Sequence, residues 1–131
     1  LKIPVQMQGK SFKNAFSNES EAQREAVYYH YYEYPIWHKV QPHYGVRTNR
    51  YKLIHFYYSM DEWELYDLQS DPNEMNNIYN DANPKLISDL KSKLELLKLQ
   101  YKDTGSIEQM KLMTDTVIKR VYNEPSKELK K

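Results

Sequence analysis

Alternating apolar and polar positions predict a small antiparallel sheet in the first half of the chain. Four runs rich in β-branched and aromatic residues are separated by short connections: 26–32, 44–48, 51–58 and 63–68. The third run is apolar on both sides, with Leu53 on one and Ile54 and Phe56 on the other, as is typical of a central strand. Short connections favour antiparallel pairing. We therefore expect a four-stranded antiparallel sheet.

The tightest connection lies between the second and third runs. It consists of Asn49 and Arg50, and asparagine tolerates the left-handed backbone that a tight hairpin turn demands. The sequence therefore predicts a hairpin here, with Asn49 in the left-handed region. The segment 34–42, between the first and second runs, holds two prolines and is expected to be an ordered loop.

Two helix signals follow the predicted sheet. The segment 71–74 has the arrangement of a capping box, which predicts a short helical turn with Met75 and Ile78 tucked inward. The second signal is Asn83 followed by a proline, after which apolar residues recur on one helix face. They are Ile87, Leu90, Leu94, Leu97 and Tyr101. This spacing predicts an amphipathic helix of about four to five turns packed against the sheet, so the expected fold class is α+β.

The two ends of the chain are less regular. Residues 1–25 show no sustained periodicity and are expected to be a linker, with one turn of helix near 12–16. Residues 104–131 form an extension in which a capping signal at 106–109 predicts a helix, although four β-branched residues lower its helix propensity. The chain starts with neither an initiator methionine nor a secretory signal, so we expect its N-terminus to be truncated.

Composition narrows the classes of function. The 131 residues include 19 Lys and Arg against 18 Asp and Glu, and this charge of +1 gives no overall field for nucleic acid or an anionic membrane. Basic and aromatic residues are interspersed with acidic ones and lack the signature of RNA-binding sheets, which argues against a nucleic-acid partner. No apolar run approaches the roughly 18 residues of a membrane span. The absence of cysteine excludes disulfides and thiolate metal sites.

Tyrosine is the unusual component of the chain. There are 13 tyrosines beside 3 phenylalanines, and five of the tyrosines lie between positions 28 and 34. The tyrosine ring is largely apolar whereas its hydroxyl needs a partner, so this residue suits half-buried faces that contact another body. The cluster therefore predicts an interface.

No set of residues in the sequence has the arrangement of an active site. Four histidines, His30, His38, His43 and His55, match no metal-ligand spacing, so polar or packing roles are favoured over a metal site. The acidic segment 61–64 is better explained as a solvated loop than as a catalytic pair. A Gly-x-Ser-x-Gly element and a glycine-rich phosphate loop are both absent from the sequence. No catalytic residue and no metal site are assigned.

Several motifs, in a fixed order, resemble the C-terminal region of type I sulfatases. His43 to Ile54 contains the Gly-Val-Arg-Thr and Arg-Tyr-Lys-Leu-Ile strands of that family, and 63–68 contains its Glu-Leu-Tyr-Asp-Leu strand. The segment 71–77 resembles the Asp-Pro-x-Glu turn that follows, and 7–12 resembles the segment that leaves the catalytic domain. Each fragment alone is weak, but the ordered set is specific and covers roughly residues 3 to 103.

The resemblance implies the non-catalytic C-terminal part of a sulfatase, in which 1–25 leads from a catalytic domain and 26–103 forms the subdomain. Such enzymes hydrolyse sulfate esters, often of glycans, with a formylglycine made from a Cys/Ser-x-Pro-x-Arg motif beside calcium. Neither that motif nor the calcium-binding acid clusters of the family occur here, so no cofactor is expected in this chain, and it should be inactive alone. Exported locations, such as the periplasm, are usual for the family.

The resemblance also implies a partner and a substrate. The partner is the N-terminal catalytic domain, and the subdomain closes one side of a cleft for a sulfated glycan. By position, the candidate contacts to this substrate are Trp37, His38, His43 and Tyr44. Aromatic stacking and hydrogen bonds to hydroxyls would be their means of binding. The alternative is a stand-alone glycan-binding or adaptor module that shares the fold without a catalytic domain.

Overall fold

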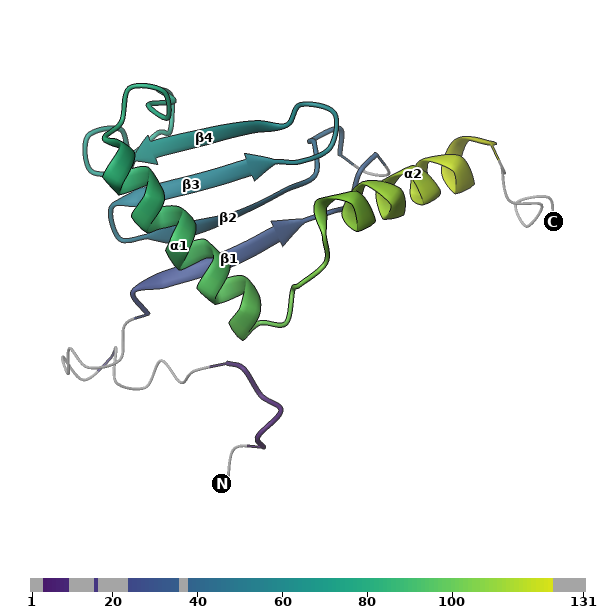
Figure 1. Ribbon diagram of the computed structural model, residues 1–131, viewed down its shortest axis with the longest axis horizontal. Helices are drawn as coiled ribbons and strands as arrows, with labels where there is room; N and C mark the ends of the chain where they lie inside the picture. The colour runs from purple at the N-terminus through teal and green to yellow at the C-terminus, as the bar shows by residue number, and fades with distance from the viewer. Residues whose placement is uncertain (1–3, 10–15, 17–23, 36–37, 124–131) are drawn as a thin grey trace.

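A four-stranded antiparallel sheet with one helix lying across it forms the centre of the molecule (Figure 1). The computed structural model describes residues 4–9, 16, 24–35 and 38–123. The strands are β1 (Ala26–Tyr31), β2 (His43–Thr48), β3 (Tyr51–Phe56) and β4 (Glu62–Asp67), and they lie side by side in this order. The predicted sheet is confirmed, and β3 is an inner strand, as its apolar composition indicated. The helical turn expected near 12–16 lies outside the described residues, apart from residue 16.

The hairpin between β2 and β3 is present, but a threonine side chain closes it. The Thr48 hydroxyl oxygen accepts hydrogen bonds from the backbone N–H groups of Tyr51, at 2.8 Å, and Arg50, at 3.3 Å. Asn49 does not have a positive φ, so the prediction of a left-handed asparagine in this turn is wrong. Because the hydroxyl takes up the free N–H groups of the turn, no left-handed residue is needed.

The segment after Asp71 forms a turn instead of the predicted helical turn. The Glu74 N–H donates to the Asp71 carbonyl at 3.1 Å, and the Asp71 carboxylate accepts from the Asn76 N–H at 2.8 Å. Glu74 then has φ 55°, a left-handed conformation that cannot continue a right-handed helix. Met75 is 77% exposed, contrary to expectation, whereas Ile78 packs on the core as predicted.

Helix α1 (Pro84–Gln100) follows the predicted pattern from its first residue. The Asn83 side chain accepts a hydrogen bond from the Lys85 N–H at 2.8 Å, which caps the helix. Leu90 and Leu94 are buried against the sheet. They join a core that also contains Tyr44, Val46, Leu53, Tyr57, Leu65 and Met110. The sheet with its C-terminal helix thus confirms the α+β architecture.

Helix α2 (Ile107–Asn123) lies beyond the end of β1 (Figure 1). Its predicted capping box is complete, because Ser106 Oγ accepts from the Gln109 N–H and Gln109 Oε1 accepts from the Ser106 N–H. Thr114 and Thr116 donate their hydroxyls to carbonyls one turn earlier, which satisfies these groups within the helix. Neither described helix has the length and apolar character needed to cross a bilayer.

Candidate functional site

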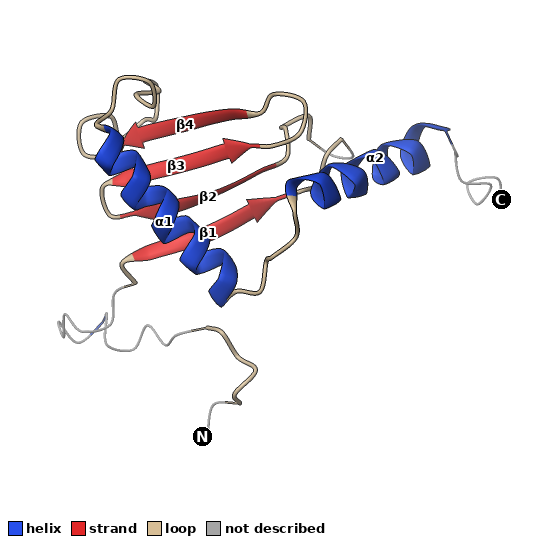
Figure 2. Cartoon of the chain, viewed as in Figure 1, coloured by secondary structure: helices blue, strands red, loops and turns tan. Residues whose placement is uncertain are grey.

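The two faces of the sheet differ in what covers them. Side chains alternate between the faces along each strand, and Val46, Leu53 and Leu65 lie on the side where Leu94 of α1 completes the core. We call this side the inner face and the opposite side the outer face. The outer face carries Val27, Tyr29, Tyr31, His43, Gly45, Arg47, Lys52, Ile54, Phe56, Glu62, Glu64 and Tyr66. Of the two described helices only α1 lies along the sheet, so no described helix covers the outer face (Figure 2).

An aromatic row crosses one end of the outer face. Tyr31, His43 and Phe56 are direct neighbours across β1, β2 and β3. The rings of Tyr31 and His43 are stacked with centroids 5.4 Å apart, and those of His43 and Phe56 lie 5.0 Å apart. His43 Nδ1 lies 2.8 Å from the Gln41 carbonyl oxygen, and because a carbonyl can only accept, Nδ1 carries the proton. This row is a half-buried, largely apolar surface with a fixed imidazole at its centre.

Next to the aromatic row lies a tyrosine whose hydroxyl has no partner in the described residues. Tyr29 faces Gly45 on β2, and a Cβ at Gly45 would lie 2.5 Å from the Tyr29 hydroxyl oxygen and 2.4 Å from the Leu53 carbonyl oxygen. Only glycine leaves room for the ring here. The Tyr29 hydroxyl is buried without a hydrogen bond, and burial raises the pKa of this phenol. It is therefore a neutral hydroxyl that the chain itself shields from solvent, which is rare in native proteins.

A charged row occupies the other end of the outer face. Arg47 and Lys52 are cross-strand neighbours, and both pair with Glu74 from the loop after β4. The Arg47–Glu74 distance is 3.7 Å, and the Arg47 side chain is 56% exposed. Beside them, the Tyr66 hydroxyl donates to Glu64 at 2.9 Å. The outer face thus changes from aromatic to charged across three rows of the sheet.

The structure separates the four residues predicted to contact a substrate. Trp37 lies outside the described residues, and His38 is exposed in the loop before β2. His43 lies on the outer face, whereas Tyr44 is 3% exposed on the inner face. Adjacent residues of a strand point to opposite sides, so one ligand on one face cannot touch both. Of the four predicted residues, only His38 and His43 are both described and at least partly exposed. His38 lies in the loop before β2, and His43 is the first residue of β2.

A second row, on the inner face, alternates histidine with other aromatic residues. His30, Tyr44, His55 and Trp63 are direct neighbours across all four strands. The His30 and Tyr44 rings are 5.8 Å apart, Tyr44 and His55 are 5.3 Å apart, and His55 stacks on Trp63 at 4.2 Å. From α1, Lys98 Nζ lies 4.5 Å from the centroid of the Tyr44 ring. We call these four residues the inner row.

Two short hydrogen-bond chains satisfy the histidines of the inner row. His55 Nε2 donates to Asp61 at 3.0 Å, and the Tyr44 hydroxyl donates to His55 Nδ1 at 2.9 Å. The second chain contains His30, whose Nδ1 donates to Asp103 at 2.7 Å. His30 Nε2 lies 3.0 Å from the Tyr57 hydroxyl oxygen, and Asp103 also accepts from Tyr28. A carboxylate only accepts hydrogen bonds. The ring nitrogen that faces it, Nδ1 of His30 or Nε2 of His55, therefore carries a proton.

The electrostatics of the inner row favour a structural role. Burial lowers the pKa of His55, against the opposing effect of Asp61, and burial raises the pKa values of Tyr44 and Tyr57 to about 12. Burial alone would raise the pKa of Asp103, but hydrogen bonds from Tyr28 and His30 lower it. The phenols stay protonated and both ring nitrogens of His55 are engaged in hydrogen bonds, so none of these groups presents a free nucleophile. The row therefore orders the core.

The residues of this chain do not supply the formylglycine site that the resemblance implies for the whole enzyme. The sequence has no cysteine and no Ser-x-Pro-x-Arg segment. In the described part of the chain, no three His, Asp or Glu side chains gather in a group that could hold a metal ion. No chemical step through formylglycine or calcium can be assigned to these residues.

The sheet, the helix across it and the ordered motifs belong to a known class, the C-terminal part of sulfatases. The profile of the family described as "N-sulphoglucosamine sulphohydrolase, C-terminal" matches residues 1–100, and the chain belongs to that family. The chain is 47% identical over 113 residues to an N-acetylglucosamine-6-O-sulfatase of Bacteroides thetaiotaomicron. The match covers 83% of this chain and 20% of that relative, so the chain spans about a fifth of its length.

The fold is also shared with a solved protein. The solved structure of a protein in complex with its substrate, D-glucosamine-2-N,6-O-disulfate, is similar to this chain, with a TM-score of 0.76 and 47% sequence identity. The match covers 83% of this chain and 23% of that one. At this identity the similarity extends beyond the fold to the sequence motifs, and the match to the C-terminal part of sulfatases confirms the family predicted from those motifs.

Proposed function

We propose that this chain serves an enzyme that hydrolyses sulfate esters of amino sugars, by docking on its catalytic domain and closing one side of the substrate cleft. The observation that carries this proposal is the 47% identity to an N-acetylglucosamine-6-O-sulfatase. In this proposal 1–25 is the linker from the catalytic domain, 26–103 is the subdomain and 104–131 is an extension. Formylglycine and calcium belong to the catalytic domain, so bond cleavage takes place there.

The outer face is the surface that docks, and the end of it that carries His43 borders the substrate cleft. Its aromatic row is half-buried in the free chain, and a largely apolar surface of this kind is typical of interdomain contacts. Arg47 at the other end offers a charge-assisted contact that fixes orientation.

The loop before β2 is the part that faces the substrate. His38 is exposed in it, and the His43 ring at its end is held by the Gln41 carbonyl. In this proposal Trp37, His38 and His43 stack on the sugar or hydrogen-bond its hydroxyls. Tyr44 acts from the inner face, where its bond to His55 holds the start of β2 and thereby the position of His43.

The proposal is tested on the complete open reading frame that encodes this chain. An in-frame Cys/Ser-x-Pro-x-Arg segment is expected upstream, and the purified protein is expected to release sulfate from N-acetylglucosamine 6-sulfate. Replacing the Cys or Ser of that segment by Ala should abolish sulfate release. A reading frame without the segment, together with binding of glycans but no sulfate release, would overturn the proposal in favour of a stand-alone binding module.

The role of the loop is tested in the same protein. His38→Ala and His43→Ala should lower kcat/KM for the sulfated sugar by about tenfold each, as expected for one lost hydrogen bond to substrate. The matched control is Val40→Ala, because Val40 is exposed in the same loop but has no polar group. Unchanged kcat/KM in both histidine variants would remove the loop from the cleft.

A further inference from the structure

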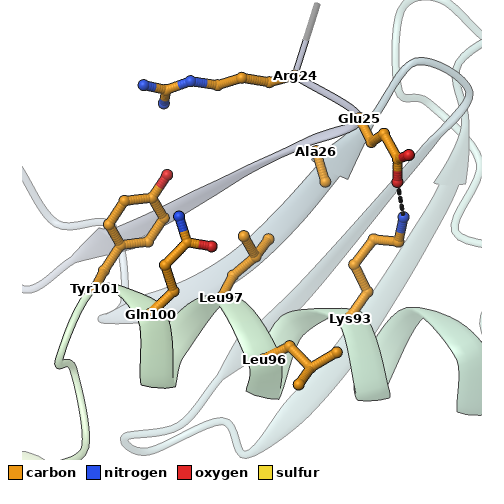
Figure 3. A pocket seen from close by; sticks show the side chains of 8 residues that line it. All are labelled: Arg24, Glu25, Ala26, Lys93, Leu96, Leu97, Gln100 and Tyr101. Carbon is orange, nitrogen blue, oxygen red and sulfur yellow. Dashed lines mark hydrogen bonds and ion pairs between the residues drawn. The ribbon is translucent and has the colours of Figure 1, made fainter. Parts of the chain in front are cut away.

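An open cleft lies between the start of β1 and the last turns of α1 (Figure 3). Its volume is about 470 Å³, which is within the range of small-molecule sites. It is lined by Arg24, Glu25, Ala26, Lys93, Leu96, Leu97, Gln100 and Tyr101. These residues lie on neither the outer face nor the loop before β2.

The charge of the cleft is positive. Lys93 Nζ lies 3.1 Å from Glu25, so these two charges offset each other. Arg24 has no carboxylate partner among the described residues, and its guanidinium makes one long contact of 3.5 Å with the Gln8 carbonyl. Figure 3 shows the Arg24 side chain directed away from the Glu25–Lys93 pair. Two cations and one anion among these lining residues leave a net charge of +1, and the fork of the Arg24 guanidinium pairs with no described carboxylate, so its geometry suits an anion.

The walls of the cleft combine an aromatic ring with free polar groups. The Tyr101 ring is stacked on Tyr28 with centroids 6.2 Å apart, so its position is fixed. Figure 3 shows Tyr101 and Gln100, from the end of α1, at the same end of the cleft as Arg24 on the opposite wall, with Leu97 beside them. In the described part of the chain, the Gln100 amide and the Tyr101 hydroxyl make no hydrogen bond to another side chain or to the backbone. An aromatic ring beside free amide and hydroxyl groups is suited to the apolar face and the hydroxyls of a sugar.

We propose that this cleft is an accessory binding site for an anionic sugar unit, with Arg24 on the acidic group and Tyr101 and Gln100 on the ring. The choice of a sulfate ester as the acidic group rests on the proposed function. The site is separate from the loop before β2, because Ala26 and Tyr31 are at opposite ends of β1. Six strand residues span about 17 Å, so an oligosaccharide of several units could reach from one site to the other.

The test is an NMR titration of the 131-residue chain with N-acetylglucosamine 6-sulfate, with N-acetylglucosamine and inorganic sulfate as separate probes. The sulfated sugar should shift the signals of Ala26, Leu97, the Gln100 side-chain amide and Tyr101. The unsulfated sugar should bind about three- to tenfold more weakly, as expected for one exposed charge-assisted contact. Inorganic sulfate alone should produce small shifts confined to Arg24.

Two pairs of variants locate the binding. Arg24→Gln should weaken binding of the sulfated sugar about three- to tenfold, whereas Arg120→Gln, which removes an exposed arginine from α2, should not. Tyr101→Leu should weaken both sugars, whereas Leu99→Ala, an exposed residue of the same helix, should weaken neither. The inference is overturned if Arg24→Gln binds normally, if inorganic sulfate reproduces the whole shift pattern, or if the shifts occur only at His38 and His43. The last result would support the loop as the sugar site while removing the cleft, so the two proposals fail separately.

Discussion

The inner and outer faces of the sheet are built from the same kinds of residue but differ in how their polar atoms are satisfied. Both carry a row in which histidine lies among tyrosine and other aromatic rings. On the inner face, each ring nitrogen of His30 and His55 has a partner within the chain. On the outer face, the buried Tyr29 hydroxyl has none among the described residues. Composition alone therefore does not distinguish a face whose buried polar atoms are all paired from one that leaves such an atom unpaired.

The two faces differ in the free-energy cost of unpaired buried groups. A buried hydrogen-bonding group without a partner costs about 1–3 kcal/mol, and native proteins leave few such groups. The inner row avoids this cost with Asp61 and Asp103, which come from outside the strands. On the outer face no described residue supplies such a partner for Tyr29, so this cost remains.

The largest expected effect comes from loosening the helix that covers the inner face. Leu94 is 0% exposed, so Leu94→Ala should lower the free energy of unfolding by about 2–5 kcal/mol. The matched control is Leu99→Ala on the same helix, where the side chain is 63% exposed and the expected change is within about 0.5 kcal/mol. Urea unfolding followed by circular dichroism measures both. Equal losses in the two variants would mean that α1 does not pack as described.

The next effect concerns the outer face, where Gly45 makes room for Tyr29. Gly45→Ala should cost about 1–3 kcal/mol, because the new Cβ would lie 2.4 Å from a backbone oxygen that cannot easily move. Gly105→Ala is the control, since its nearest atoms would lie at an ordinary 3.8 Å. Thermal unfolding compares the stability of the two variants. A Gly45→Ala variant as stable as the original chain would contradict the close packing of Gly45 against the Leu53 carbonyl and the Tyr29 ring.

Removing one tyrosine hydroxyl should destabilise the chain on the inner face but not on the outer face. Tyr44→Phe leaves His55 Nδ1 without its donor and should cost about 1 kcal/mol. Tyr29→Phe removes a hydroxyl that has no described partner, so the isolated chain should lose nothing or gain up to about 1 kcal/mol. The same urea experiment compares them. An equal loss in both variants would show that Tyr29 is satisfied within the chain.

The smallest effect is the pH dependence that His55 contributes. Burial lowers the pKa of His55 in the folded chain, although Asp61 opposes this and keeps the shift limited. The unfolded chain therefore binds this proton more readily, so stability is retained above the ordinary histidine pKa of about 6.5 and falls as the pH decreases below it. Replacing His55 by Gln should flatten the slope of unfolding free energy between about pH 5 and 7. A steeper or unchanged slope would contradict the assignment of a neutral, buried His55.

The elements of the fold could be predicted because their signals are local. Strand alternation, the Asn83 cap and the capping box at Ser106 each lie within a few residues of what they determine. The turn after Asp71 could not be predicted in this way, because one of its contacts is to a residue far away along the chain. Glu74 pairs with Lys52, 22 residues earlier, and adopts a left-handed backbone instead of continuing a helix. A local capping signal cannot report such a contact.

The candidate site was less accessible to sequence reasoning for the same reason. Asp103 bonds His30 across 73 residues, and no spacing rule connects them. The separation of His43 from Tyr44, in contrast, follows from strand parity alone, once β2 is known to begin at His43 and not one residue later. A boundary error of one residue was enough to place both on a single predicted surface.

The adjacency of His43 and Tyr44 also bears on how such chains can change over generations. Inserting one codon inside β2 would exchange its two faces, bringing buried residues to the surface and surface residues into the core. Inserting codons in the loop before Pro42 leaves that register untouched, since loops tolerate changes in length. Selection is therefore expected to keep the length of β2 constant among relatives, while the loop beside it is free to vary in length.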